Sequence, residues 1–136
     1  YGEFYPYEYP LVGKDEALEP SGLEGKPPKL VEKENRNAVL DSAVICKFSR
    51  GTVTDDRLAA LLDADYEALI DLGGRIVELE RAFNNARGFD RADDTLPYQI
   101  DGFERALSEY YAVRGWNDDG TVPGYGDGEV VGAADD

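Results

Sequence analysis

Apolar residues recur every three or four positions through most of the middle of the chain, a spacing that predicts α-helices. One helix is expected over about residues 31–42, a longer one begins after Asp65, and a last one runs over about 102–114. Strand-like alternation is scarce and no internal repeat is found. We therefore expect a mostly α, bundle-like domain over residues 31–116.

The longest predicted helix carries an apolar series that we interpret as the packing seam of a bundle helix. Asp65 is expected to cap its start and Gly88 to end it. Gly73 and Gly74 interrupt the series at a cost in helix propensity. Their presence indicates close approach of another backbone or a cofactor, with local fraying as the alternative. The seam residues are Tyr66, Leu69, Leu72, Ile76, Leu79 and Phe83.

Two shorter helices have recognisable ends. Thr54 precedes two aspartates and is expected to be an N-cap, with acidic residues in the first turn and an apolar stripe behind them. Gly115 is expected to end the last helix. The apolar face of the first short helix is Leu58, Leu61 and Leu62, and that of the last helix is Phe103, Leu107 and Tyr110.

The two ends of the chain have different compositions. Five of the seven prolines fall within the first 28 residues, so residues 1–30 are expected to be an extended arm that packs on the rest of a parent protein, or else a floppy end. Residues 117–136 are rich in glycine and aspartate and are expected to form a flexible acidic tail. The segment 118–120 lacks the spacing of a calcium loop and is interpreted as a turn.

The charge balance restricts the partners. The chain has 14 Lys plus Arg against 29 Asp plus Glu, a formal net charge of −15. Nucleic acid and anionic membranes are therefore not expected as partners. With 42% hydrophobic residues the chain is too apolar to be disordered by charge alone. We interpret it as a salt-adapted, halophilic type of folded domain, such as haloarchaeal proteins carry.

The expected location is the cytoplasm. No segment approaches the roughly 20 apolar residues of a membrane span, and no signal peptide opens the chain. A single cysteine fits a reducing compartment. The chain begins with tyrosine and contains no methionine, so it is expected to be a fragment of a longer protein.

Cys46 is the only cysteine, and the chain contains no histidine. An internal disulfide and a Cys-His nucleophile pair are therefore impossible. Cys46 is a buried hydrophobe, a nucleophile or a ligand whose co-ligands lie elsewhere. Asp41 precedes it by five residues, about 140° away on a continuous helix. For both to face one cofactor, the backbone must leave the helix between them, so Cys46 is expected just past a helix end.

The string from Asp41 through Ala43-Val44-Ile45 to Cys46-Lys47-Phe48 resembles the cluster-and-pterin motif of the tungsten-dependent aldehyde:ferredoxin oxidoreductases. The commonest form of that motif has Gly-Leu just before the cysteine. This chain has Val44-Ile45 there, which indicates a divergent subfamily.

Two later stretches extend the resemblance over roughly residues 23–123. The segment 74–97, ending in Gly88-Phe89 and then Asp93-Asp94-Thr-Leu96-Pro97, is similar to a family helix followed by Asp-Asp-x-Leu-Pro. The family often has Arg-Glu before that glycine, whereas this chain has Ala86-Arg87. The segment 109–116, with Glu-Tyr-Tyr and Arg-Gly-Trp, is similar to the final helix of the family. Asp93 and Asp94 are expected to be a capping pair rather than a catalytic dyad.

The resemblance implies specific cofactor contacts. Cys46 is implied as the fourth ligand of a [4Fe–4S] cluster, whose other three ligands come from an upstream Cys-x-x-Cys-x-x-x-Cys stretch. Asp41 is implied to accept hydrogen bonds from N–H groups of a tungsten or molybdenum bis-pterin. Ile45 and Lys47 are implied to line the pterin, with a solvated surface lysine as the alternative for Lys47. No catalytic residue is expected here, because the family's active-site glutamate and histidine lie upstream.

The implied reaction is oxidation of an aldehyde with water to a carboxylate, with ferredoxin as the electron acceptor. The implied partners are the upstream domains of the same enzyme, ferredoxin and the aldehyde, and this chain alone is not expected to be active. Two alternatives remain open: a paralogue acting on another substrate, and a non-enzymatic acidic interaction domain in which Cys46 is merely buried.

Overall fold

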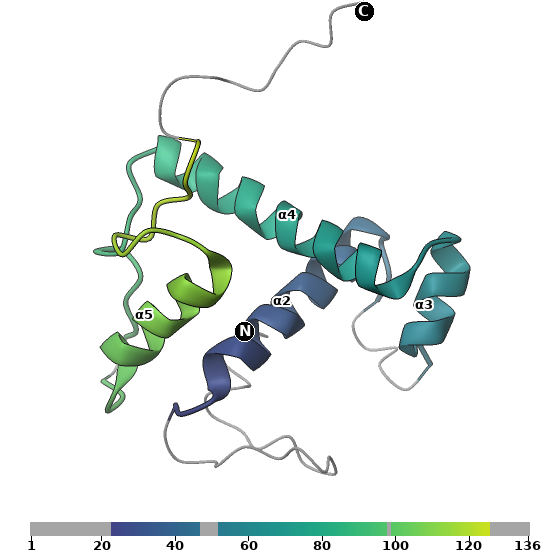
Figure 1. Ribbon diagram of the computed structural model, residues 1–136, viewed down its shortest axis with the longest axis horizontal. Helices are drawn as coiled ribbons and strands as arrows, with labels where there is room; N and C mark the ends of the chain where they lie inside the picture. Colours follow the sequence, from purple (N-terminus) through teal and green to yellow (C-terminus); the bar gives the residue numbers. More distant parts are fainter. Residues whose placement is uncertain (1–22, 47–51, 98, 126–136) are drawn as a thin grey trace, which may run out of the picture.

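The structure, a computed structural model, describes residues 23–46, 52–97 and 99–125, and these residues form four helices and no strand (Figure 1). The helices are α2 (Lys26–Ser42), α3 (Asp55–Leu62), α4 (Tyr66–Ala86) and α5 (Phe103–Arg114). α2 packs against both α4 and α5, and α3 packs against α4. The prediction of a mostly helical fold is confirmed. No helix in the described ranges has the length and apolar character needed to cross a bilayer.

α2 begins earlier than the sequence predicted. Pro27 and Pro28 lie in its first turn, and Leu23, Pro27 and Leu30 are buried. The extended arm expected over residues 1–30 is therefore wrong for residues 26–30, which are helical. Proline is tolerated in a first helical turn because its missing N–H would have no intrahelical partner there. Residues 1–22 lie outside the described residues.

The core is divided into two clusters of buried side chains. The first joins α2, α3 and α4 through Val39, Leu40, Leu58 and Leu69. The second joins α4 and α5 to the segment after α5 through Ala82, Tyr111, Trp116 and Val122. Because α4 contributes to both clusters, this 21-residue helix connects the two halves of the core.

The crossing of α2 over α4 depends on Gly73. A Cβ atom built on Gly73 would lie 2.7 Å from the carbonyl carbon of Asn35 in α2, inside van der Waals contact. Gly74 faces only the Asn35 side chain, whose Nδ2 would be 3.2 Å away. The expectation of a close backbone approach is confirmed at Gly73, and α4 is continuous through both glycines.

The predicted apolar seam of α4 is only partly correct. Leu69 is buried, but Leu72, Leu79 and Phe83 are exposed. The other buried residues of α4 are Gly73 and Ala82. The reason is that α2 approaches α4 over its glycine face, which allows closer backbone contact than the leucine face. On α3 only Leu58 is buried, and Leu61 and Leu62 are exposed.

The predicted helix ends are close to the observed ones. The Asp65 side chain accepts a hydrogen bond from the Ala68 amide at 3.2 Å and caps α4. Thr54 occupies the N-cap position of α3, although its side chain makes no capping bond. Gly88 and Gly115 follow α4 and α5 with φ values of 91° and 72°, a left-handed conformation that glycine adopts without steric cost.

The segment after α5 is packed, which corrects the prediction of a flexible tail for residues 117–125. The Asn117 amide donates to the Thr121 carbonyl at 2.9 Å, and Val122 is buried. The Gly120 amide donates to the Asn117 carbonyl at 2.9 Å, so the interpretation of 118–120 as a turn is confirmed. Burial of Val122 stabilises this segment in a way that its glycine-rich composition did not reveal. Residues 126–136 lie outside the described part of the chain.

Candidate cofactor-facing site at the end of α2

The chain leaves the helix between Asp41 and Cys46, as predicted. The Val44 amide donates to the Asp41 carbonyl at 3.0 Å, and the Ile45 amide donates to the Leu40 carbonyl at 2.8 Å. These two bonds form a Schellman motif, which ends a helix by placing one residue in the left-handed region. That residue is Val44, with φ 57°. Cys46 follows two residues later, outside the helix.

Val44 is an unusual residue for this position. Left-handed backbone costs an L-residue roughly 1–2 kcal/mol, and a β-branched residue there is a clear outlier. Val44 is 90% exposed, so its side chain gains almost no burial in return. Val44 stands where the commonest form of the family motif has glycine. It is also the residue of this turn that has a left-handed backbone.

The turn directs its side chains in two directions. Ile45 packs against the core cluster that contains Leu40 and Leu58. Cys46 is exposed, and Asp41 in the last turn of α2 is also exposed. The alternative in which Cys46 is a buried structural residue is therefore wrong. Lys47 lies outside the described residues.

The exposed thiol fits one ligand of a shared metal group. A [4Fe–4S] cluster is usually held by four thiolates, and this chain contains one cysteine. Among the residues that the structure describes, no group of three histidines, cysteines or carboxylates could hold a metal ion. Ligands from other parts of a protein can reach Cys46 because it is on the surface. The turn can present one thiolate and one acceptor carboxylate, and the chain contains no histidine.

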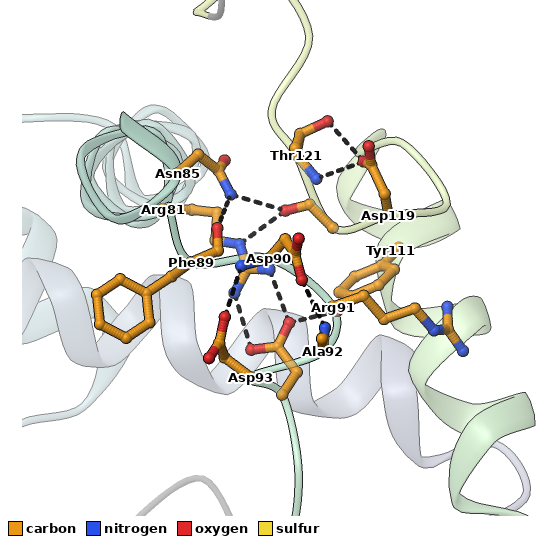
Figure 2. Close-up of polar contacts among 12 residues, drawn as sticks. Arg81, Asn85, Phe89, Asp90, Arg91, Ala92, Asp93, Tyr111, Asp119 and Thr121 are labelled. Carbon is orange, nitrogen blue, oxygen red and sulfur yellow. Dashed lines mark hydrogen bonds and ion pairs between the residues drawn. The ribbon is translucent and has the colours of Figure 1, made fainter. Parts of the chain in front are cut away.

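A second polar cluster surrounds Asp94. Figure 2 labels Arg81, Asp93 and Tyr111 in this region. Arg81 donates to both carboxylate oxygens of Asp94 at 2.8 and 2.7 Å, and its Nε donates to the Gly120 carbonyl at 2.7 Å. The Tyr111 hydroxyl donates to the same carboxylate. Asp93 instead accepts from the Asp90 amide at 3.0 Å within its own turn. The capping prediction is confirmed for Asp93 and is wrong for Asp94, which is an ion-pair partner.

Burial and charge hold this cluster in one protonation state. Burial, followed by the hydrogen bond to Asp94, raises the pKa of Tyr111 above its ordinary value. For Arg81, burial lowers the pKa, but the hydrogen bond and charge of Asp94 outweigh it and the net shift is upward. Tyr111 therefore remains a proton donor and Arg81 a cation at neutral pH. We therefore interpret the cluster as structural, because neither Tyr111 nor Arg81 exchanges a proton near neutral pH.

A third polar cluster joins α5 to α2. Arg114 donates to Glu34 at 2.6 Å and to the Asn35 side chain at 2.6 Å, and the Tyr110 hydroxyl donates to Glu34 at 2.7 Å. Burial and then the Glu34 charge raise the pKa of Tyr110. The partners are about 80 positions apart, and no local spacing in the sequence could have paired them.

A cavity of about 340 Å³ lies between the second and third clusters. Of its charged groups, Glu34 is paired with Arg114 and Asp94 with Arg81, and Asp93 accepts from the Asp90 amide. The rest of its lining is mainly apolar and comes from α2, α5 and their neighbours Leu96, Ile100 and Trp116. Among the described residues no group that could hold a metal ion lies there, and the end of α2 remains the better candidate site.

The chain is similar to known proteins over most of its length. Residues 2–124 match the family model described as aldehyde ferredoxin oxidoreductase, domains 2 and 3. Three similar proteins are named tungsten-containing aldehyde ferredoxin oxidoreductase: those of Pyrococcus furiosus, 32% identical, Thermococcus kodakarensis, 30%, and Pyrococcus abyssi, 30%. Each alignment covers 83% of this chain and 22% of the relative.

The match gives the class of this helical chain. It belongs to the aldehyde ferredoxin oxidoreductase family, in the region described as domains 2 and 3. The chain spans about 22% of the length of the relatives that it matches.

Proposed function

We propose that the chain is the carboxy-terminal part of an aldehyde:ferredoxin oxidoreductase, in which Cys46 is the fourth ligand of a [4Fe–4S] cluster. Asp41, Ile45 and Lys47 contact a tungsten or molybdenum bis-pterin, and the other cluster ligands come from upstream. The whole enzyme oxidises an aldehyde to a carboxylate and passes electrons to ferredoxin. This chain by itself is inactive, and the enzyme works in the cytoplasm.

The observation that carries the proposal is the position of Cys46 on the surface directly after the Schellman turn of α2. A surface thiol two residues beyond a left-handed residue is open to ligands from another domain. The turn is fixed at its base, because Ile45 is packed into the core cluster. A ligand held on a rigid turn keeps its direction when the rest of the cluster assembles.

The cofactors supply the redox chemistry when they are bound, and the residues of this chain supply position. Asp41 offers acceptor oxygens only, so it can pair with N–H donors of a pterin ring and not with its carbonyl groups. The Ile45 side chain is held by the core, which leaves its backbone to line the cofactor. Cys46 contributes a thiolate, the form in which cysteine binds iron.

The test is the substitution Cys46→Ala in the longer polypeptide that contains this chain. Iron per protein should fall, or the cluster should convert to a three-iron form, and the four-iron electron paramagnetic resonance signal should be lost. Helix content by circular dichroism should stay at the wild-type level, because Cys46 is exposed and lies outside α2.

Ser42→Ala is the matched control, since Ser42 is an exposed residue in the last turn of the same helix. It should leave the iron content unchanged. A four-iron signal of full intensity in Cys46→Ala would show that the fourth ligand lies elsewhere and that the proposed role of Cys46 is wrong.

A further inference from the structure

One face of α4 carries an apolar stripe that no other described helix covers. Leu72, Ile76, Leu79 and Phe83 follow one another at intervals of four, three and four residues. At 100° per residue they lie within an arc of about 60°, and at 1.5 Å per residue they extend over about 16 Å. These four residues are called the outer stripe.

The outer stripe is exposed over most of its length. Leu72 is 47% exposed, Leu79 54% and Phe83 61%, and Ile76 is half-buried. α2 and α5 lie on one side of α4 in Figure 1, where the other side of the helix has no described helix against it. The outer stripe therefore continues the apolar series past the buried Leu69, which lies about 20° from Ile76 around the helix, onto a surface that stays exposed.

Covering an exposed apolar stripe of this kind lowers the free energy of the protein. Full burial of one large apolar side chain favours association by roughly 1.5–3 kcal/mol, and contiguous exposed apolar patches mark interaction sites. Leu79, Phe83 and Asn84 also line a shallow hollow in the surface. Arg87 lies over the Phe83 ring at 5.1 Å and borders the end of the stripe. Aromatic residues and arginine are both enriched at protein interfaces.

Charge argues against a second copy of the chain as the occupant. Each chain has a formal net charge of −15, so two copies repel each other at close range. The relatives are much longer than this chain, which covers 22% of their length, so a longer polypeptide offers many other segments. The alternation of three and four residues is the spacing at which one helix packs lengthwise along another.

We propose that the outer stripe is the docking surface for an amphipathic helix from the part of the longer polypeptide that lies outside this chain. The inference rests on the proposed function only in requiring that the chain be one segment of a larger protein. It needs neither the cluster nor the pterin. Leu79 and Phe83 should lose the most exposed surface on docking, because they are the most exposed members of the stripe.

The direct test is hydroxyl-radical footprinting of the longer polypeptide, read by mass spectrometry. After correction for intrinsic reactivity, Leu79 and Phe83 should be labelled as slowly as the buried Leu69 and Tyr111. Labelling at the rate of half-exposed side chains would overturn the proposal. Because this measurement uses the unmodified protein, it does not depend on any variant folding.

A substitution provides an independent test of the docking surface. Leu79→Ser should lower the thermal midpoint of the longer polypeptide, because the serine loses the apolar contact. Leu61→Ser is the matched control: Leu61 is 67% exposed on α3 and lies off the stripe. Leu79→Ser should lower the thermal midpoint more than Leu61→Ser does. Equal shifts of the midpoint for the two variants would count against docking at the stripe.

The concentration dependence of the labelling distinguishes a docked helix from a second copy of the chain. Protection of Leu79 and Phe83 that is lost on dilution would identify a second copy as the occupant and overturn the proposal, whereas protection independent of concentration supports it. Iron content measured on the same sample tests the proposed function separately. A covered stripe in a protein without iron leaves this inference standing and removes the cluster assignment.

Discussion

The Ile45 amide donates a hydrogen bond to the Leu40 carbonyl at 2.8 Å, and this bond turns the chain out of α2 just before Cys46. The same bond recurs at the three other helix ends, from Ala64 to Ala59 at 3.1 Å, from Phe89 to Asn84 at 3.2 Å and from Trp116 to Tyr111 at 2.9 Å. The left-handed residue is glycine after α4 and α5, and it is Asp63 after α3. In the turn next to Cys46 it is Val44, the one β-branched residue of the set, for which this conformation is the most strained.

Val44→Gly should stabilise the protein. Glycine removes the left-handed strain, offset in part by its greater freedom in the unfolded chain, for a net gain of about 1 kcal/mol. Urea unfolding followed by circular dichroism measures the change. Asp63→Gly is the matched control: Asp63 has φ 49°, but aspartate tolerates this region better than valine. A gain at Asp63 that equals or exceeds the gain at Val44 would contradict the strain assigned to Val44.

Gly73→Ala should destabilise the protein by about 1–3 kcal/mol, the range for overpacking a close contact. The new methyl group would collide with the Asn35 backbone, which cannot move without shifting α2. Gly74→Ala should be neutral or stabilising by up to about 1 kcal/mol, because alanine favours helix and only the movable Asn35 side chain faces it. Thermal unfolding of the two variants gives the comparison, and similar losses in both would show that the α2–α4 crossing does not depend on Gly73.

Asp41→Asn tests the proposed pterin contact. Asparagine keeps the shape but replaces one acceptor oxygen with an NH₂ donor, which would oppose the pterin N–H groups and leave a pair unmade, at a cost of about 1–3 kcal/mol. Pterin content and aldehyde turnover of the longer polypeptide should both fall. Asp56→Asn, at an exposed aspartate of α3, should change neither. Wild-type pterin content and turnover in Asp41→Asn would mean that Asp41 is structural.

Stability should decrease at alkaline pH through Tyr111 and Tyr110. Burial first, and then a neighbouring carboxylate, raises the pKa of each above its ordinary value of 10.0. The folded state thus favours the neutral phenol. This contribution is complete below about pH 10 and is lost as the pH rises through the higher pKa of the folded state. The free energy of unfolding should therefore fall above about pH 10.

Tyr111→Phe should reduce this alkaline slope and, by removing the bond to Asp94, cost about 1 kcal/mol near neutral pH. Tyr125→Phe, at an exposed tyrosine, serves as the control and should leave the slope close to wild type. Urea unfolding at a series of pH values provides the data. An unchanged slope in Tyr111→Phe would show that the phenol does not titrate with unfolding.

Salt should stabilise the protein, because its net charge is −15. At 1 M salt the Debye length is about 3 Å, so repulsion between surface carboxylates is screened. Melting followed by circular dichroism should give a higher midpoint in molar KCl than in dilute buffer. Sucrose at equal osmolality controls for general exclusion effects. A midpoint that is the same in both salt concentrations would argue against the halophilic interpretation.

Local structure was predictable from the sequence. The caps at Asp65 and Thr54 and the glycine ends of α4 and α5 were placed from residue type alone, since capping and termination depend on groups within a few positions. The departure of the chain from the helix before Cys46 followed from the angular spacing of five residues once Asp41 and Cys46 were taken to face one cofactor. The start of α2 was missed because proline is compatible with both an extended arm and a first helical turn.

The sequence by itself therefore determined where helices form, that they dominate, and that Cys46 lies beyond a helix end. Only the tertiary structure decided which face of α4 is buried, because that choice depends on how closely α2 can approach Gly73. It also paired Arg81 with Asp94 and Arg114 with Glu34, contacts that join separate elements across space. The physical reason is range: helix formation is governed by neighbours along the chain, whereas burial and ion pairing are governed by neighbours that only folding brings together.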